Sequence, residues 1–394
     1  MAELKECVIV DGVRTPNARA HKDKGWFRNR RPDELIIRVY EALFERNPKV
    51  KPEDIEAVFC GTANQTGMQN DIARLAWLAG GFPESTPTNG VNQQCPSGMS
   101  CIEHAARAIM CDEGDIYIAS GVEDMMNVPM AFQMDMTPRL GERYNIFEFP
   151  MGMTAEKVAA TYNISREDQE LMALWSHKRA CEARDAGKFK DEIVPIEGHK
   201  EDGTAFMVEH DQWIRDSIST EKMATMKPAF KPDGIVTAAT SSPLTVGACA
   251  VLLMSRDKAD KLGLEYHIKY RAGAMVGCDP TMMGMGPLYS TRKVVERAGV
   301  PIEEVEVFEV NEAFASQSLA CVRELGIEKN APFEKVNLWG GALALGHPLG
   351  ESGARVVVTL NNIMKTDKKD AKLGVATLCG GFGQGNATMW EKVS

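Results

Sequence analysis

The hydrophobic pattern of the chain alternates between short apolar runs and longer amphipathic stretches. The short runs are typical of buried strands, and the amphipathic stretches are typical of helices that cover a sheet. The pattern therefore predicts an α/β fold with buried, partly parallel sheets. Strands are expected at residues 7–11, 57–60, 115–120, 305–310, 336–338 and 374–378.

Two parts of the chain repeat one pattern. Residues 52–61 (PEDIEAVFCG) parallel residues 301–310 (PIEEVEVFEV). The repeat continues in two more pairs of segments, 91–99 with 336–353 and 115–124 with 374–383. This self-similarity predicts two copies of one α/β unit, each of which supplies part of one active site at their junction.

The middle of the chain differs from both copies, because it is rich in methionine and charge and has long polar connections. A helix is expected at residues 165–186, since Ser165 begins a turn that is close to a capping box. We therefore expect three parts in the chain. They are an N-terminal half of residues 1–121 plus 251–272, an inserted segment of residues 122–250, and a C-terminal half of residues 273–394.

Composition and charge narrow the class of protein. A chain of 394 residues with 44% hydrophobic and 25% charged residues is typical of a globular protein with more than one domain. The net charge of −10 argues against nucleic-acid partners and against a polybasic membrane anchor. No apolar run approaches the roughly 20 residues of a membrane span, and the N-terminus lacks a signal-peptide pattern, so we expect cytoplasmic placement. Ten cysteines without a CxxC pair favour a reducing compartment and no metal site.

Four short segments carry candidate chemistry. Cys95 lies in NQQCPSG, Asn311 in NEAFA, His347 in GGALALGHPLGESG and Cys379 in CGGFGQG. Two thiols, an imidazole and an amide, each beside glycine or at the end of a strand, form a set suited to covalent thioester chemistry. Pro96 is expected at the first position of a helix, so that Cys95 caps this helix and the helix dipole stabilises its thiolate.

These segments, in this order, resemble those of the thiolases, and the resemblance runs from VIVDGVRTP near the N-terminus to LCGGFGQGNA near the C-terminus. It implies duplicated halves that form a five-layered αβαβα core, with an inserted loop domain that covers coenzyme A. It also implies a reaction in which coenzyme A cleaves a 3-ketoacyl-CoA into acetyl-CoA and a shortened acyl-CoA. Coenzyme A is then a co-substrate, and no permanently bound cofactor is expected. The implied assembly is a homodimer or homotetramer, and a hydratase–dehydrogenase subunit is a candidate further partner.

The resemblance also implies roles for single residues. Cys95 is the nucleophile that carries the acyl group, His347 is its base, and Cys379 is the thiol that protonates the departing acetyl-CoA carbanion. Asn311 holds a water that forms one oxyanion hole with His347, and the backbone N–H groups of Cys95 and Gly381 form the other. The candidates for contacts with pantetheine and the acyl group are Ser242, Met151, Met283 and Phe314.

Several positions depart from the usual thiolase pattern. Gln94 and Pro96 flank the nucleophile where an apolar and a small residue are usual. Gly380 and Phe382 stand in CGGFGQG where CIGxGQG is common, and Glu351 replaces a small residue in HPLGESG. None of these changes removes a catalytic group. Gln94 and Phe382 are expected to reshape the acyl channel.

The choice between two thiolase branches depends on softer signals, because the branches share every catalytic residue. Pro150 stands where short-chain thiolases usually carry histidine, and FRNRRPDEL, VGCDPTMMGMGP and VTAATSSPL are most similar to the bacterial fatty-acid-oxidation type. We therefore favour a 3-ketoacyl-CoA thiolase of β-oxidation over a short-chain acetyl-CoA C-acetyltransferase.

Three other classes of protein account for fewer of the four candidate residues than a thiolase does. A non-catalytic acyl-CoA-binding subunit needs no proton-transfer pair, a cysteine peptidase has no use for Cys379, and a ketoacyl synthase has no second thiol. The glycine string at residues 381–385 invites a dinucleotide-loop interpretation, but such a loop must open a helix, whereas residues 386–394 read as a closing strand.

Overall fold

The computed structural model describes residues 4–131 and 133–393. Its main sheet has the strand order β10–β11–β12–β9–β1–β8–β5–β3–β4, and the short β2 pairs with β8. The strands of this sheet are β1 (Cys7–Arg14), β2 (Ala18–Arg19), β3 (Ala57–Gly61), β4 (Thr88–Val91), β5 (Ile116–Asp124), β8 (Thr245–Ser255), β9 (Ile268–Gly277), β10 (Val307–Val310), β11 (Leu373–Gly380) and β12 (Gln384–Lys392).

The sheet consists of two similar halves. In the first half, β3 runs parallel to β4 and β5, and the antiparallel β8 joins β5 to β1. In the second half, β10 runs parallel to β11, and the antiparallel β12 joins β11 to β9. The halves meet where Val8 of β1 pairs with Lys269 of β9. A single 3-10 turn precedes the equivalent strands β3 and β10, at Pro52–Asp54 and Ile302–Glu304, which is the repeat that the sequence predicts.

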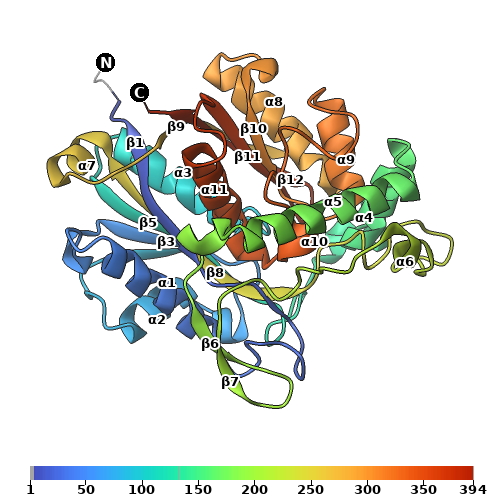
Figure 1. Cartoon of the computed structure of the whole chain (residues 1–394), viewed down its shortest axis with the longest axis horizontal. Helices are drawn as coiled ribbons and strands as arrows, with labels where there is room; N and C mark the ends of the chain where they lie inside the picture. Colours follow the sequence, from blue (N-terminus) through green and yellow to red (C-terminus); the bar gives the residue numbers. More distant parts are fainter. Residues whose placement is uncertain (1–3, 132, 394) are drawn as a thin grey trace.

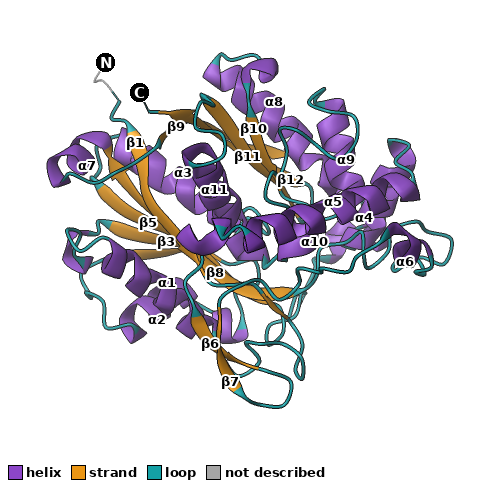
Figure 2. Ribbon diagram, in the orientation of Figure 1, coloured by secondary structure: helices purple, strands orange, loops and turns teal. Residues whose placement is uncertain are grey.

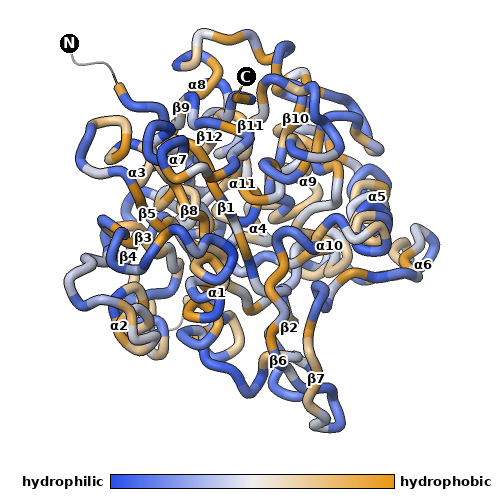
Figure 3. Tube along the Cα trace, turned by 60° about the vertical axis from the view of Figure 1, so that its left-hand side comes forward, coloured by the Kyte–Doolittle hydropathy of each residue, from blue (hydrophilic) through white to orange (hydrophobic). Residues whose placement is uncertain are grey.

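Helices complete five layers (Figures 1 and 2). The helices α3 (Ser97–Met110) and α11 (Leu349–Lys365) pack against each other between the two halves of the sheet. The outer helices α1 (Pro32–Arg46) and α2 (Ile72–Ala79) cover the first half, and α8 (Gly286–Ala298) covers the second, with α9 (Ala315–Glu324) beside it. The predicted α/β class with partly parallel sheets is confirmed. Figure 3 shows that hydrophobic residues concentrate along the strands around β1, β5 and β8, whereas the outer turns are mostly hydrophilic.

The elements between β5 and β8 lie mainly beside the second half of the sheet (Figure 1). Of these, α5 contacts α9 and α10, and α4 contacts α9. The hairpin of β6 and β7 projects from the body of the molecule. The bounds here are α4 (Met151–Thr161), α5 (Arg166–Asp185), β6 (Ile196–His199), β7 (Ala205–Val208) and α6 (Thr220–Ala224). The remaining helices are α7 (Arg256–Leu262) and α10 (Ala342–Leu345). In the part of the chain that the structure describes, no helix has both the length and the hydrophobicity to cross a bilayer.

Glycines allow the two central helices to begin very close to each other. A Cβ at Gly98 would lie 2.7 Å from the carbonyl oxygen of Gly350, and a Cβ at Gly353 would lie 2.4 Å from the backbone nitrogen of Met99. Both distances are too short for a side chain, so glycine is required at both positions. The glycines around His347 and after Cys95 therefore position the starts of α3 and α11.

The structure tests two local predictions, a helix and a strand. The helix at residues 165–186 is confirmed as α5, and the Ser165 hydroxyl accepts a hydrogen bond from the Asp168 amide as its N-cap. The strand at residues 336–338 is wrong, since Val336 makes only an isolated bridge with Phe308. The pairing ends at Asn337, because its φ of 48° leaves the extended region and its side chain bonds to both the backbone N–H and the carbonyl of Val310.

Two further predictions concern the ends of elements. The helix after the nucleophile begins at Ser97, so Pro96 is its N-cap rather than its first residue, and Cys95 precedes the cap. The closing strand is β12, which forms a hairpin with β11, so the glycine string is a turn between strands and does not open a helix. The last residue of the predicted closing strand, Ser394, lies outside the described residues.

Candidate active site

The nucleophile candidate Cys95 lies in a tight turn between β4 and α3. The Ser97 side chain closes the turn, because its hydroxyl accepts from the Gln93 amide at 2.9 Å and donates to the Gln94 carbonyl at 2.5 Å. Gln94 has a φ of 59°, in the left-handed region that non-glycine residues rarely adopt. The turn buries Cys95, which is 2% exposed.

Burial controls the protonation of this thiol. Together with the nearby Glu123 carboxylate, burial raises the pKa of Cys95 to about 12, although hydrogen bonds from the backbone N–H groups of Gly381 and of Cys95 itself oppose this rise. Cys95 is therefore a neutral thiol at neutral pH and needs a base when it attacks. The two amides that sequence reasoning placed in one oxyanion hole both face its sulfur.

The base candidate His347 precedes α11 and is 4% exposed. Burial and the neighbouring Arg355 guanidinium lower the pKa of His347 to about 3, so its imidazole is neutral. Its Nδ1 lies 2.7 Å from the Ser352 hydroxyl, which donates to the Pro348 carbonyl at 2.9 Å. Because that hydroxyl gives its hydrogen to Pro348, it accepts from Nδ1–H, and Nε2 keeps a lone pair that can take a proton.

The amide of Asn311 lies directly beside this imidazole. Its Nδ2 is 3.4 Å from both ring nitrogens of His347, and its Oδ1 accepts from Arg355 Nη2 at 3.2 Å. The Asn311 backbone N–H donates to the Thr377 carbonyl of β11 at 3.0 Å. Because Arg355 occupies the amide oxygen, the amide N–H groups are directed toward the imidazole.

The second thiol, Cys379, lies near the end of β11 and is fully buried. Burial raises the pKa of Cys379 well above its ordinary value, and the nearby thiol group of Cys95 raises it further. The structure therefore brings the two cysteines together, and both rest as neutral thiols.

Three of the softer candidates gather around Cys379. Met283 and Phe314 belong to one buried apolar cluster with Cys379, and Met151 packs against that cluster. The fourth candidate, Ser242, adjoins the cluster through its backbone N–H, which donates to the Ala313 carbonyl at 3.0 Å.

Sequence reasoning missed the residues that hold the imidazole and the amide. Ser352 and Arg355 lie on the first turns of α11, in the string HPLGESGAR. The signal was the proline after His347, since a helix that begins there places Ser352 one turn beyond Pro348. A third missed residue is Glu123, a buried carboxylate that accepts from the backbone amides of Ala63 and Gly350.

Two of the departures from the thiolase pattern, Pro96 and Gly380, are in contact in the structure. A Cβ at Gly380 would lie 2.9 Å from Pro96 Cδ and 3.1 Å from the Gln93 carbonyl oxygen. Pro96 after the nucleophile therefore requires a glycine at position 380, where a larger residue is usual. A third departure, Phe382, has a φ of 63° and is 41% exposed, and its ring packs edge-on against Phe149 with centroids 6.1 Å apart.

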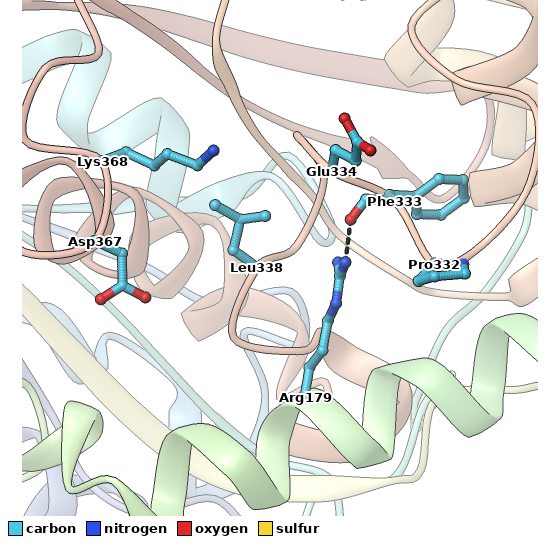
Figure 4. A pocket seen from close by; sticks show the side chains of 7 residues that line it. All are labelled: Arg179, Pro332, Phe333, Glu334, Leu338, Asp367 and Lys368. Carbon is cyan, nitrogen blue, oxygen red and sulfur yellow. Dashed lines mark hydrogen bonds between the residues drawn. The ribbon is translucent and has the colours of Figure 1, made fainter.

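An open hollow of about 530 Å³ lies elsewhere, between α5 and the C-terminal end of α11 (Figure 4). Two of its charged side chains already bond to other residues of the protein. Arg179 donates to the Phe333 carbonyl, and Asp367 accepts from Trp339 Nε1 at 2.8 Å and from Lys188. The hollow is lined by Arg179, Pro332, Phe333, Glu334, Leu338, Asp367 and Lys368. None of these is a predicted site residue, so the thiol cluster remains the candidate active site.

The described residues contain no group of three or more His, Cys, Asp or Glu side chains that could hold a metal ion.

Comparison with known proteins gives one consistent result. Residues 7–257 match the model of the thiolase N-terminal domain, and residues 264–392 match that of the thiolase C-terminal domain. The chain is 46% identical over 391 residues to a protein of Marinobacter nauticus named 3-ketoacyl-CoA thiolase, which covers 99% of both chains. It is 45% identical over 391 residues to the Aliivibrio fischeri protein of the same name, covering 99% of this chain and 100% of the relative.

Solved structures agree with the sequence relatives. A Bacillus anthracis acetyl-CoA acetyltransferase is similar with a TM-score of 0.89 and 35% identity, over 100% of both chains. Human mitochondrial 3-ketoacyl-CoA thiolase is similar with a TM-score of 0.88 and 31% identity, also over 100% of both chains. With both domains matched and full-length relatives well above 30% identity, this chain belongs to the thiolase family.

Proposed function

We propose that this protein is a 3-ketoacyl-CoA thiolase that uses coenzyme A as co-substrate and holds no permanent cofactor. The observation that carries the proposal is a pair of buried neutral thiols that lie near each other, with the Gly381 amide directed at Cys95. A buried neutral imidazole lies beside Asn311, whose backbone N–H bonds to Thr377, two residues before Cys379. Acyl transfer alone needs one thiol, whereas cleavage of a carbon–carbon bond also needs an acid for the carbanion. The second thiol, Cys379, can serve as that acid.

In the first half-reaction, Cys95 Sγ forms a bond to the C3 carbon of the substrate, and the thiol proton passes to His347 Nε2. The backbone amides of Cys95 and Gly381 stabilise the negative oxygen on C3. The C2–C3 bond then breaks, and its electron pair takes the proton of Cys379 to give acetyl-CoA. Asn311, through a water, and His347 stabilise the enolate oxygen of the leaving group. An acyl group remains on Cys95.

In the second half-reaction, the thiol of coenzyme A gives its proton to the Cys379 thiolate and attacks the thioester carbon. The bond between this carbon and Cys95 breaks. The Cys95 thiolate takes back the proton held by His347, so both thiols and the imidazole return to their neutral forms. Burial favours these neutral resting forms, because a charge in a low-dielectric site is stable only beside an opposite charge or a hydrogen-bond donor or acceptor.

The second candidate function is that of a short-chain acetyl-CoA C-acetyltransferase, since a similar solved structure carries the name acetyl-CoA acetyltransferase. The sequence relatives at 44–46% identity are named 3-ketoacyl-CoA thiolase, which favours the first function. The two differ in the acyl chain that the site accepts. We expect Gln94, which packs against Gly381, and Phe382, which follows it, to influence this chain.

The experiment that separates them is CoA-dependent thiolysis across a series from acetoacetyl-CoA to a long-chain 3-ketoacyl-CoA. We expect kcat/KM to hold or rise with chain length. Activity confined to acetoacetyl-CoA would establish the second function, and no thiolysis with any member of the series would refute both.

Assembly and placement belong to the same proposal. We expect a homodimer or homotetramer, which size-exclusion chromatography with light scattering measures directly. A hydratase–dehydrogenase subunit is the candidate partner, and co-purification from the native source tests it. A reducing compartment keeps both thiols free for catalysis, which supports the expectation that the protein acts in the cytoplasm.

A further inference from the structure

A single hydroxyl group links His347 to a buried carboxyl group. The reaction proposed above does not use this carboxyl group. Glu351 is the third residue of α11 and is fully buried. Its Oε2 is 3.3 Å from the Ser352 hydroxyl, and that hydroxyl is 2.7 Å from His347 Nδ1. Carboxyl, hydroxyl and imidazole thus form a continuous chain that ends at the proposed base.

The direction of the hydrogen bonds in this chain follows from the acceptors. The Ser352 hydroxyl can donate to the Pro348 carbonyl at 2.9 Å or to Glu351 Oε2, and in both cases it accepts from His347 Nδ1–H. When His347 takes the proton of Cys95 and becomes positive, rotation of the hydroxyl hydrogen toward Glu351 gives a charge-assisted chain. An ionised carboxylate two hydrogen bonds away favours the protonated imidazole strongly, because the surroundings are dry.

The charged groups that face Glu351 do not neutralise it by direct pairing. Arg14 of β1 is engaged with Glu192 at 2.8 Å and with Asp211 at 2.7 Å. Arg355, one turn along α11, donates to Asn311. Among the described residues, Glu351 Oε1 and Arg355 Nε and Nη1 have no hydrogen-bond partner.

This arrangement leaves Glu351 able to change its charge. Burial raises the pKa of Glu351 to about 7, against the opposing effect of Arg355 and Arg14 and with a further rise from Asp211. The carboxyl group is thus protonated below about pH 7 and ionised above it, within the range in which the enzyme can be assayed.

We propose that Glu351 is a positioning residue that acts through Ser352 to hold His347 with its proton on Nδ1 and to stabilise the imidazolium that forms when Cys95 attacks. The proposal rests on the proposed function only in taking His347 as the base for Cys95. It adds a carboxylate to the catalytic set without contact between that carboxylate and the substrate.

The test is the pH dependence of single-turnover acylation of Cys95 by 3-ketohexanoyl-CoA, followed by rapid quench and intact mass. For the wild-type enzyme we expect the rate to fall as the pH drops through about 7, because Glu351 takes up a proton there. Glu351→Gln is expected to react about tenfold more slowly at pH 8 and to lack this fall. The loss is smaller than the 10²–10⁴-fold contribution typical of a general base, because the base itself remains.

Two further variants keep the test decisive. Ser352→Ala cuts the chain while leaving the carboxylate, so it should also lose the fall near pH 7, and Glu351→Gln added to it should cause little further loss. This variant serves alone if Glu351→Gln does not fold. Glu170→Gln is the matched control, because Glu170 is also a buried glutamate, but its carboxylate pairs with Arg166 on α5 and not with Ser352. It should keep the wild-type rate and profile.

The outcomes separate this inference from the proposed function. If the wild-type enzyme forms no acyl adduct on Cys95, the function itself fails. If the wild type is acylated but Glu351→Gln keeps its rate and its pH profile, or if the losses of Glu351→Gln and Ser352→Ala add in full, Glu351 has no role through Ser352 and the inference is overturned.

Discussion

The Cys95 turn and the His347 turn occupy equivalent places in the two halves of the molecule. Each reactive residue directly precedes a proline that is the N-cap of a central helix, Pro96 for α3 and Pro348 for α11. Each is almost completely buried. The same physical cause acts on both with opposite sign, because burial raises the pKa of the thiol and lowers that of the imidazole. Both groups are therefore neutral before substrate arrives.

The two turns differ in what surrounds the reactive atom. Backbone amides face the sulfur of Cys95, whereas the side chains of Ser352 and Asn311 hold the ring of His347. Amides can stabilise a negative oxygen, and side chains can fix a tautomer. The same turn therefore holds a nucleophile in one half and a base in the other. The difference comes from the backbone amides around Cys95 and the side chains around His347.

The largest expected effect separates the two thiols. Cys95→Ser should abolish both acylation and thiolysis, whereas Cys379→Ala should lose about 10²–10⁴-fold in carbon–carbon cleavage while Cys95 still exchanges acyl groups with acyl-CoA. Exchange of labelled coenzyme A into acyl-CoA measures the second activity. Equal loss of both activities in Cys379→Ala would mean that this thiol is not a separate acid.

The next effect tests the side chains at the His347 turn. Asn311→Ala removes the amide beside the imidazole and should lower kcat by about 10²–10³-fold, the usual cost of one oxyanion donor. KM should change little, since the amide acts on charge that forms in the transition state. A change confined to KM would place Asn311 in substrate binding instead.

A third effect concerns pH and stability. The unfolded chain protonates His347 near pH 6.5, but burial lowers its pKa to about 3 in the folded protein. The unfolded state therefore binds more protons between these values, so the free energy of unfolding should fall as the pH drops from about 6.5 toward 3. His347→Gln should fall less steeply in urea titrations over this window. His177, whose pKa burial lowers to about 4, leaves a remaining slope in both proteins. Identical slopes would show that His347 is not held neutral.

The smallest effect tests a contact between the Cys95 turn and the Cys379 hairpin. Gly380→Ile should destabilise the protein by about 1–3 kcal/mol, because its Cβ would meet the Pro96 ring. Pro96→Ala should recover part of that loss in the double variant. Urea unfolding of the four proteins gives the coupling free energy, and additive losses would show that the two departures from the family pattern are independent.

Much of the fold and of the candidate site could be predicted from the sequence. The repeat of residues 52–61 in 301–310 and the apolar runs of β1, β3, β5 and β11 are local signals, and local periodicity carries them directly. Ser165 marked the start of α5, because capping depends on neighbouring residues only. Glycine and proline neighbours marked Cys95, His347 and Cys379, and Asn311 was marked by its place at the end of a predicted strand.

The features that could not be predicted depend on contacts between residues that are far apart in the sequence. The expected strand at 336–338 ends at Asn337, because the side chain of this residue bonds to the backbone of Val310 on the neighbouring strand β10. The dependence of Gly380 on Pro96, and the link from Arg355 to Asn311, exist only after the two halves pack. The sign of the Cys95 pKa shift was also missed, since a helix start suggests a stabilised thiolate, whereas burial dominates in the fold.

The most direct test of the account is the intact mass of the enzyme after brief incubation with a 3-ketoacyl-CoA in the absence of free coenzyme A. The account predicts one acyl group per chain, two carbons shorter than the substrate acyl chain, located on Cys95 by peptide mapping and released by coenzyme A. No adduct, or an adduct on Cys379 or another thiol, would contradict it.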